Sequence, residues 1–261
     1  MVHVPAAILL KVREMELLAW HPGKWEAPDR KFIGHRDILT RSLARYRWIL
    51  PELRGPLLEI GCGRGYGLEV LSEVGSIRVG VDLSLPFLRE AQSLNREVSW
   101  VQATGSALPF KSHSFHSIVA LEVIEHIPED RRFIENLIPL VRKGGIIVLS
   151  TPNRQATSAH SGKPLDPFHV REYTADEFAH LLKEVFPSVS LYGQRDEVRR
   201  NTAGLRFLKR VPERWKYLFP AWLQGLLSVA LRPPLRFEEC IFSQEDIETA
   251  HTFLAICRIE K

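Results

Sequence analysis

Long apolar runs are absent from this 261-residue sequence, and the longest one covers only residues 221–231. A helix of that length is too short to cross a bilayer, which takes about 20 residues. The three cysteines, Cys62, Cys240 and Cys257, fit neither a disulfide framework nor a metal-binding spacing. The N-terminal stretch lacks a basic segment and a clear cleavage site, so we expect it to belong to the fold rather than to a signal peptide. These absences indicate a cytoplasmic protein.

The overall composition is ordinary for a globular chain, with 45% hydrophobic and 25% charged residues, so a sizeable core can form. There is no internal repeat and no low-complexity tract. The net charge of +4 is unevenly distributed, because residues 195–236 hold ten Lys and Arg against three Asp and Glu. This asymmetry indicates either an acidic partner or membrane surface near the segment, or a solvated basic face. Both interpretations stay open.

Strand-like and helix-like segments alternate along most of the chain, a pattern typical of a mostly parallel sheet with helices on both faces. We expect strands at residues 56–60, 77–82, 98–103, 117–122, 145–151, 188–193 and 251–259. We expect helices at residues 66–74, 86–95, 129–141 and 174–185, the last of which begins with Thr174 and Glu177 in a capping box. The sequence therefore predicts an α/β fold with a Rossmann-like, seven-stranded sheet.

Two segments do not follow this alternation. The first, residues 1–50, contains an expected helix at 36–50 that ends at Pro51, which lacks the N–H group a helix needs. The second, about 195–245, mixes basic with aromatic residues and interrupts the sheet before its last strand. We expect residues 1–50 to form an N-terminal helical cap. Residues 51–261 would then form one domain that carries the second segment as a helical lid insertion.

The clearest local signal is the segment LLEIGCGRGYG at residues 57–67. An apolar strand runs into Gly61, Gly63 and Gly65, and a helix follows. Glycines allow a tight turn and let the backbone approach a ligand closely, and open α/β sheets bind ligands at the carboxyl ends of their strands. The glycine pattern alone is weak, because dinucleotide-binding oxidoreductases share it. The segment therefore predicts a cofactor site without naming the cofactor.

Two acidic residues and a third loop narrow the range of cofactors that the site could bind. Glu59 stands just before the first glycine, Asp82 ends the next strand, and the segment VQATGSALPF at 101–110 follows the third strand. A carboxylate at the position of Asp82 can accept hydrogen bonds from both hydroxyls of a ribose. These segments resemble the class I S-adenosylmethionine-dependent methyltransferases over about residues 55–194.

The resemblance implies S-adenosylmethionine as the cofactor and a class I methyltransferase domain within residues 51–261. It also implies a cofactor site formed by Glu59, Gly61, Cys62, Gly63, Gly65, Asp82, Leu83, Thr104, Ser106, Ala107 and Leu121. Members usually carry an acid where this chain has Thr104, whose hydroxyl would have to replace the carboxylate that contacts adenine. For the side chain of Cys62 itself, we expect a small packed group in the turn.

Candidate groups for the chemistry follow the fourth and fifth strands. Methyl transfer needs an aligned nucleophile and, for a hydroxyl, a group that helps to remove its proton. Glu122, Glu125 and His126 are spaced i, i+3 and i+4, which would place them on one face of a helical turn. Together with His169 in the segment FHVREYT, they could hold a divalent cation with open positions.

The pattern E-x-x-E-H followed by H-x-x-E-aromatic-T resembles the metal site of small-RNA 2′-O-methyltransferases and is similar to ubiquinone-biosynthesis O-methyltransferases. The resemblance implies a cation that binds the acceptor hydroxyls, with the ligands Glu122, Glu125, His126 and His169. The alternative is a metal-free site whose general base is His126, His160 or His169. In that alternative His169 and Glu172 could simply pin a loop.

The segments STPNR, DPFHVREYT and YGQR resemble bacterial methyltransferases associated with glycan and other envelope-polymer pathways. The resemblance implies an oxygen acceptor, with a hydroxyl of a glycan, a small molecule or a lipid-linked molecule as the first expectation. Residues 195–236 would then contact the membrane surface peripherally. The alternatives are a quinone or other phenol, an RNA 2′-hydroxyl, and a non-catalytic protein that binds the cofactor. Nucleic acid is the less favoured partner, because no recognisable RNA-binding module is attached.

Overall fold

The computed structural model describes residues 28–159, 161, 163–197 and 235–260. The chain divides into two compact units. Among the described residues, the first unit holds residues 46–195 and 242–260, and the second holds 28–45, 196–197 and 235–241. Most of the expected cap and lid, and the apolar run 221–231, lie outside the described residues. The domain boundaries therefore stay a prediction.

The strands form one eight-stranded sheet in the order β3-β2-β1-β4-β5-β8-β6-β7. Neighbouring strands from β3 to β5 run parallel, and β8 runs antiparallel to both β5 and β6. The strands are β1 (Leu57–Ile60), β2 (Arg78–Asp82), β3 (Ser99–Gln102), β4 (Phe115–Leu121), β5 (Val141–Pro152), β6 (Ser188–Asp196), β7 (Cys240–Ser243) and β8 (Thr252–Arg258). The Rossmann-like α/β prediction is confirmed.

The predicted strand number was wrong, because the sheet has eight strands rather than seven. The additional strand, β7, lies within the segment that we expected to form the helical lid. It is four residues long and follows the 3-10 helix η4 (Phe237–Glu239). The strands β1 and β3 are equally short and were predicted, so length alone does not explain the miss; β7 stands in a segment whose mixed basic and aromatic residues we interpreted as a helical insertion.

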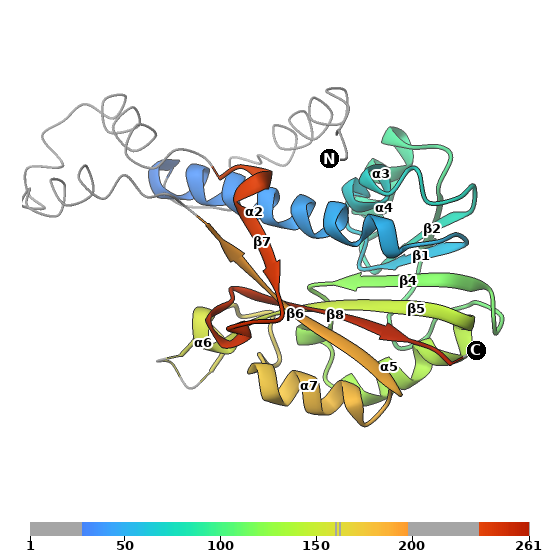
Figure 1. Cartoon of the computed structure of the whole chain (residues 1–261). Helices are drawn as coiled ribbons and strands as arrows, with labels where there is room; N and C mark the ends of the chain where they lie inside the picture. The colour runs from blue at the N-terminus through green and yellow to red at the C-terminus, as the bar shows by residue number, and fades with distance from the viewer. Residues whose placement is uncertain (1–27, 160, 162, 198–234, 261) are drawn as a thin grey trace, which may run out of the picture. The chain divides into compact units, whose positions relative to one another are not determined.

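Helices cover both faces of the sheet, with α3 and α4 on one side and α5 and α7 on the other (Figure 1). The α-helices are α2 (Pro28–Ile49), α3 (Tyr66–Val70), α4 (Leu85–Leu94), α5 (Asp130–Leu137), α6 (Arg154–Thr157) and α7 (Ala175–Lys183). The remaining 3-10 helices are η1 (Leu50–Glu52), η2 (Ile124–His126), η3 (Ile138–Leu140) and η5 (Ile247–Thr249). The helix expected at 36–50 begins earlier, at Pro28, and ends before Pro51 as expected.

The main core lies between the sheet and the helices α5 and α7. Phe133 of α5, Phe178 of α7 and Phe253 of β8 are fully buried and belong to one apolar cluster with the strands. Each such side chain contributes about 1.5–3 kcal/mol by leaving water. This packing holds the strands β1, β4 and β5 in place, and the carboxyl ends of these strands carry the candidate site.

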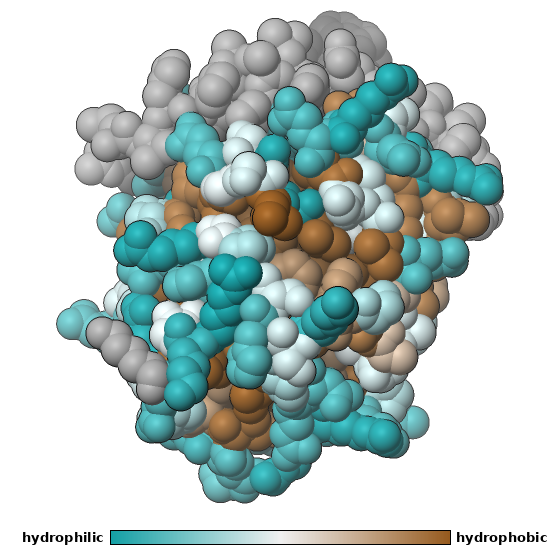
Figure 2. Space-filling view, turned by 90° about the vertical axis from the view of Figure 1, so that its right-hand side faces the viewer, coloured by the Kyte–Doolittle hydropathy of each residue, from teal (hydrophilic) through white to brown (hydrophobic). Residues whose placement is uncertain are grey.

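In the described part of the chain, no helix combines the length and the apolar character needed to cross a membrane. On the face of the molecule turned to the viewer in Figure 2, hydrophilic side chains surround the apolar ones.

The capping box of α7 gives a test of the local fold. The hydroxyl of Thr174 accepts a hydrogen bond from the Glu177 amide at 3.3 Å, and the Glu177 carboxylate accepts one from the Thr174 amide at 2.9 Å. We predict that Thr174→Ala lowers the free energy of unfolding by about 1 kcal/mol, measured by urea denaturation. Thr174→Ser keeps the hydroxyl and should stay within a few tenths of the unchanged protein. Equal losses in both variants would contradict a role for the cap.

Candidate active site

The predicted glycine turn follows β1 and has the backbone conformation that glycine permits. Gly63 has φ 52° and Gly65 has φ 80°, in the left-handed region where an L-residue costs about 1–2 kcal/mol. A Cβ on Gly65 would lie 2.4 Å from the ring of Trp100, so a larger residue has no room there. The turn is fixed to β2, because the Gly61 and Cys62 amides donate to the Val81 carbonyl at 2.8 and 3.0 Å.

One side of the turn is open. A Cβ on Gly63 would meet nothing within 4 Å, so a ligand can approach the backbone at this point. Asp82, at the end of β2, accepts hydrogen bonds from the Gly63 and Ser84 amides, both at 2.8 Å. A carboxylate has about four acceptor positions, so two more donors, such as the hydroxyls of a ribose, can still bind. The residues therefore fit a nucleoside-containing cofactor.

The surface beside Asp82 is partly apolar. Leu83 is 65% exposed. Ala107 is exposed as well, and the exposed hydroxyls of Thr104 and Ser106 lie 3.0 Å apart in hydrogen-bond contact. Leu83 follows β2 and the two hydroxyls follow its neighbour β3, and an apolar group with polar groups after the adjacent strand suits adenine, which has apolar faces and a polar edge.

Three of the predicted cofactor residues, Cys62, Leu121 and Glu59, have buried side chains. Cys62 is buried, and burial together with the nearby carboxylates of Glu59 and Asp82 raises the pKa of its thiol, so the group stays protonated and unreactive. Leu121, at the end of β4, is also buried. Their side chains pack in the core, and only the backbone of Cys62 lies in the turn itself.

Glu59 is a fully buried acid in β1, beneath the glycine turn. Its carboxylate accepts a hydrogen bond from the Tyr46 hydroxyl. Burial raises the pKa of the Glu59 carboxyl to about 8, although hydrogen bonds from Tyr46 and from the Leu68 backbone act in the opposite direction. The group is thus mostly protonated at neutral pH in the folded chain.

Glu122 does not lie on a helical turn with Glu125 and His126, contrary to the sequence expectation. Its φ is 56°, outside the helical region, and the 3-10 helix η2 begins only at Ile124. The Glu122 carboxylate accepts a hydrogen bond from the Ser150 hydroxyl at 2.9 Å, and its amide donates to that hydroxyl at 3.0 Å. These contacts hold the side chain of Glu122 against the end of β5.

The structure brings together three of the four predicted metal ligands. One ligand atom each from Glu125, His126 and His169 lies within 4.8 Å of the other two, and Glu122 is not part of the group. The rings of His126 and His169 pack edge to face, with centroids 4.9 Å apart. The Glu125 side chain is fully buried, whereas that of His126 is exposed. His160, the remaining candidate base, lies outside the described residues.

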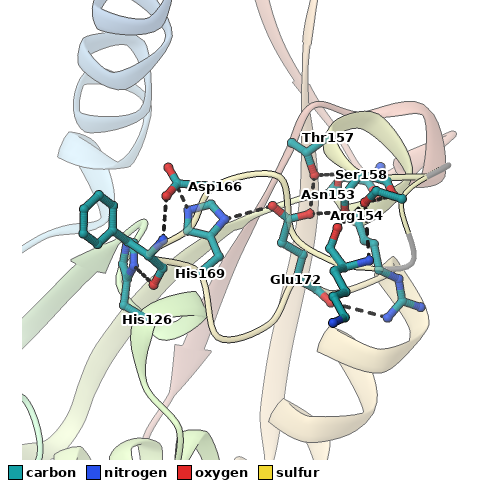
Figure 3. Close-up of polar contacts among 11 residues, drawn as sticks. His126, Asn153, Arg154, Thr157, Ser158, Asp166, His169 and Glu172 are labelled. Carbon is teal, nitrogen blue, oxygen red and sulfur yellow. Dashed lines mark hydrogen bonds and ion pairs between the residues drawn. The ribbon is translucent and has the colours of Figure 1, made fainter. Parts of the chain in front are cut away.

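Both imidazole rings are anchored through Nδ1. His126 Nδ1 lies 2.9 Å from the Phe168 carbonyl, and His169 Nδ1 lies 2.8 Å from the Glu172 carboxylate (Figure 3). A carbonyl oxygen only accepts hydrogen bonds, so Nδ1 of His126 carries the proton and Nε2 has the lone pair of the neutral ring. That lone pair can bind a cation or accept a proton. Metal-binding histidines usually hold their other nitrogen against a carbonyl or a carboxylate in this way.

Backbone and ionic contacts fix the loop that carries His169. The Glu125 carbonyl accepts hydrogen bonds from the Val170 amide at 2.8 Å and the Arg171 amide at 3.3 Å. The carboxylate of Asp130, in α5, accepts from the Arg171 guanidinium at 2.6 Å and from the Tyr173 hydroxyl at 2.7 Å. The loop after β5 is therefore tied to the turn after β4, and this tie brings His126 and His169 together.

Three residues around the group were not assigned to the site from the sequence. Glu172 is buried and contacts His169, and Ser150 holds Glu122. An Asp166 carboxylate oxygen lies 3.8 Å from Nε2 of His169. The spacing of His169 and Glu172 was the one sequence signal for any of them. Ser150 contacts Glu122, which is 28 residues away in the sequence, so no local sequence pattern reveals that contact.

Comparisons with known proteins show what this chain is similar to. Residues 58–149 match the family model described as methyltransferase domain. A probable S-adenosylmethionine-dependent methyltransferase of Mycobacterium tuberculosis is 34% identical over 138 residues, which cover 52% of this chain and 50% of that protein. A ubiquinone biosynthesis O-methyltransferase of Dinoroseobacter shibae is 32% identical over 167 residues, which cover 59% of this chain and 66% of that protein. The chain thus spans about half the length of the mycobacterial relative.

Among solved structures, a methyltransferase of Thermotoga maritima described as a possible histamine N-methyltransferase has a TM-score of 0.60 and 16% identity. The similarity covers 97% of this chain and 99% of that one, and at this identity it shows the fold alone. Residues 58–149 thus form a methyltransferase domain, within the fold of the class I S-adenosylmethionine-dependent methyltransferases. The predicted class is confirmed.

The buried Glu59 carboxyl gives a prediction about pH. Its pKa is about 8 in the folded chain and near 4.5 when unfolded, so between these values the unfolded chain is ionised and the folded chain is not. This one group therefore lowers the free energy of unfolding by about 1.4 kcal/mol for each pH unit gained in that window. Glu59→Gln stays neutral and should lack that decrease. Urea denaturation at pH 5, 6, 7 and 8 measures the difference, and parallel curves for the two proteins would contradict the assignment.

Proposed function

We propose that the protein is an S-adenosylmethionine-dependent O-methyltransferase. The observation that carries the proposal is the position of the Glu125, His126 and His169 group next to the glycine turn. The turn follows β1, whereas Glu125 and His126 follow β4, and these two parallel strands are neighbours in the sheet. A Cβ on Gly61 would lie 2.5 Å from the side chain of Val123, so the two loops are in contact.

Some residues of this chain bind the cofactor, and others accept the hydroxyl proton of the acceptor. When bound, the cofactor supplies a methyl group on a sulfonium, which is an electrophile. The Asp82 carboxylate binds the ribose hydroxyls, and the exposed face of Leu83 packs against adenine. Nε2 of one of the two histidines, His126 or His169, would take up the hydroxyl proton of the acceptor as the methyl group is transferred to its oxygen. Exact placement of the two reacting atoms supplies much of the rate.

A divalent cation is the second way in which the same group can act. Two imidazole nitrogens and one carboxylate are a common ligand set for catalytic Zn²⁺ and for Fe²⁺ or Mn²⁺. The anchored Nδ1 atoms of His126 and His169 fit this role, and Glu125 supplies the carboxylate. Such an ion would lower the pKa of an acceptor hydroxyl. Glu122 would have to leave Ser150 to become a fourth ligand.

For the acceptor, we put forward a hydroxyl of a glycan or of a related small or lipid-linked molecule. The support is the resemblance of the segments around β5 and His169 to envelope-polymer methyltransferases. A quinone or other phenol is the second candidate, and the name of the Dinoroseobacter relative supports it. The basic segment 195–236, which would contact an acidic or membrane-bound acceptor, lies almost wholly outside the described residues. A peripheral membrane contact stays a prediction, as does the absence of a nucleic-acid partner.

Removal of the Asp82 carboxylate tests the cofactor site. We predict that Asp82→Ala weakens the binding of S-adenosylhomocysteine at least about 100-fold, because two hydrogen bonds to a charged group are lost. Isothermal titration calorimetry measures the affinity. Asp176→Ala removes an exposed acid at the start of α7 and serves as the matched control, with unchanged affinity. Tight binding by Asp82→Ala would remove this residue from the site, and no binding by the unchanged protein would overturn the proposed function.

A metal titration distinguishes cation binding by the group from proton transfer to a histidine. Protein treated with a chelator is titrated with Mn²⁺ and Zn²⁺ in the presence of S-adenosylhomocysteine. If a cation acts at the group, we predict one site in the unchanged protein and at least a tenfold weaker site in Glu125→Gln, which keeps the shape of the side chain. No metal binding by the unchanged protein would leave proton transfer to a histidine as the mechanism. Unchanged turnover in both His126→Gln and His169→Gln would exclude both roles.

A further inference from the structure

The side chain of Glu172 has no part in the function described so far, yet it is almost completely buried next to the site. Its exposed fraction is 1%, and it makes three hydrogen bonds. One carboxylate oxygen accepts from the hydroxyls of Thr157, at 2.6 Å, and Ser158. The other oxygen lies 2.8 Å from Nδ1 of His169. Figure 3 shows Glu172 between these two hydroxyls and the imidazole ring.

The protonation of this contact follows from its partners. One oxygen of the Glu172 carboxylate already accepts hydrogen bonds from two hydroxyls, and such donors favour the ionised form of the group. An ionised carboxylate only accepts hydrogen bonds, so the proton of the shared contact is on Nδ1 of His169. The neutral ring then has its lone pair on Nε2.

In the described part of the chain, Nε2 of His169 makes no hydrogen bond. The carboxylate of Asp166 is 3.8 Å away, beyond hydrogen-bond distance. The ring is only about one eighth exposed, since the exposed fraction of its side chain is 12%. A mostly buried imidazole whose single lone pair has no protein donor is arranged to receive a proton or a cation from a ligand.

We propose that Glu172 is a positioning residue, which keeps the proton of His169 on Nδ1 and so presents the Nε2 lone pair to the acceptor. This inference rests on the proposed function, in which His169 acts at the acceptor hydroxyl. The hydroxyls of Thr157 and Ser158 fix the orientation of the Glu172 carboxylate, because they donate to the oxygen that does not face His169. The loop contacts of Arg171 and Tyr173 fix the backbone, whereas Glu172 fixes the tautomer.

The variant Glu172→Gln distinguishes a role in fixing the tautomer of His169 from a role in holding the loop. The two hydroxyl donors favour the orientation in which the amide oxygen stays toward Thr157 and Ser158, so the amide NH₂ faces His169. An NH₂ group can only donate, and His169 must then accept at Nδ1 and carry its proton on Nε2. A wrong tautomer of this kind disables the catalytic histidine of serine proteases when its aspartate becomes asparagine.

The experiment is long-range ¹H–¹⁵N correlation spectroscopy of the full chain with ¹⁵N-labelled histidine at pH 8.5, about two units above the ordinary pKa of imidazole. His169→Gln identifies the signal of His169. We expect the Nδ1–H form in the unchanged protein and at least a tenfold shift of the tautomer ratio toward Nε2–H in Glu172→Gln. The affinity for S-adenosylhomocysteine should stay within about twofold in the variant, because Glu172 does not contact the cofactor turn.

Tyr173→Phe is the matched control, since it removes the contact with Asp130 that pins the same loop but leaves the His169 contact in place. We expect its His169 tautomer to be unchanged. Equal changes in Tyr173→Phe and Glu172→Gln would show that Glu172 only pins the loop, and would overturn the proposal. The Nε2–H form in the unchanged protein would overturn it without any variant. Absence of S-adenosylhomocysteine binding would instead contradict the proposed function, so the two failures are distinguishable.

Discussion

The parallel direction of the strands β1 to β5 is the constraint on which the rest of the site depends. Because these strands run the same way, their carboxyl ends meet at one edge of the sheet. Every candidate group follows one of these ends within the next loop, or is tied to such a loop. The amides of the glycine turn are bound to the last residues of β2, so the cofactor loop cannot move without opening the sheet at that edge.

A second constraint joins the loops after β4 and β5. The Glu125 carbonyl binds two amides of the loop that carries His169, and the His126 ring binds the Phe168 carbonyl. Asp130 adds an ion pair with Arg171 on the side of α5. The group is therefore held from two strand ends. Contacts within the chain hold its geometry, which is the kind of preorganisation that electrostatic catalysis requires.

The parts of this arrangement that are local in the chain could be predicted from the sequence. The seven expected strands, the glycine turn and the Thr174–Glu177 capping box depend on neighbours within a few residues, so pattern and spacing reveal them. The short strand β7 and the left-handed backbone of Glu122 could not be predicted. β7 is a strand because of its place in the sheet, and Glu122 leaves the helical region because Ser150, 28 residues away, binds its amide and its carboxylate. Such contacts form only when the chain has folded.

The sequence pattern gives His126 and His169 the same candidate role, but in the structure different contacts hold the two rings. The Nδ1 contact of His126 closes the loop that carries His169, so a substitution of His126 removes a ring nitrogen and also loosens the loop. Nδ1 of His169 contacts Glu172, which lies on the other side of the ring from that loop contact (Figure 3). Glu172 is bound in turn by the hydroxyls of Thr157 and Ser158. The Thr157 hydroxyl also contacts the Asn153 carbonyl at 2.9 Å. Asn153 is itself held by the carbonyls of Glu248 and Ala250, both at 2.8 Å. His169 is thus positioned from the side of β5 and β8, and its Nε2 can act without changing how the loop is closed.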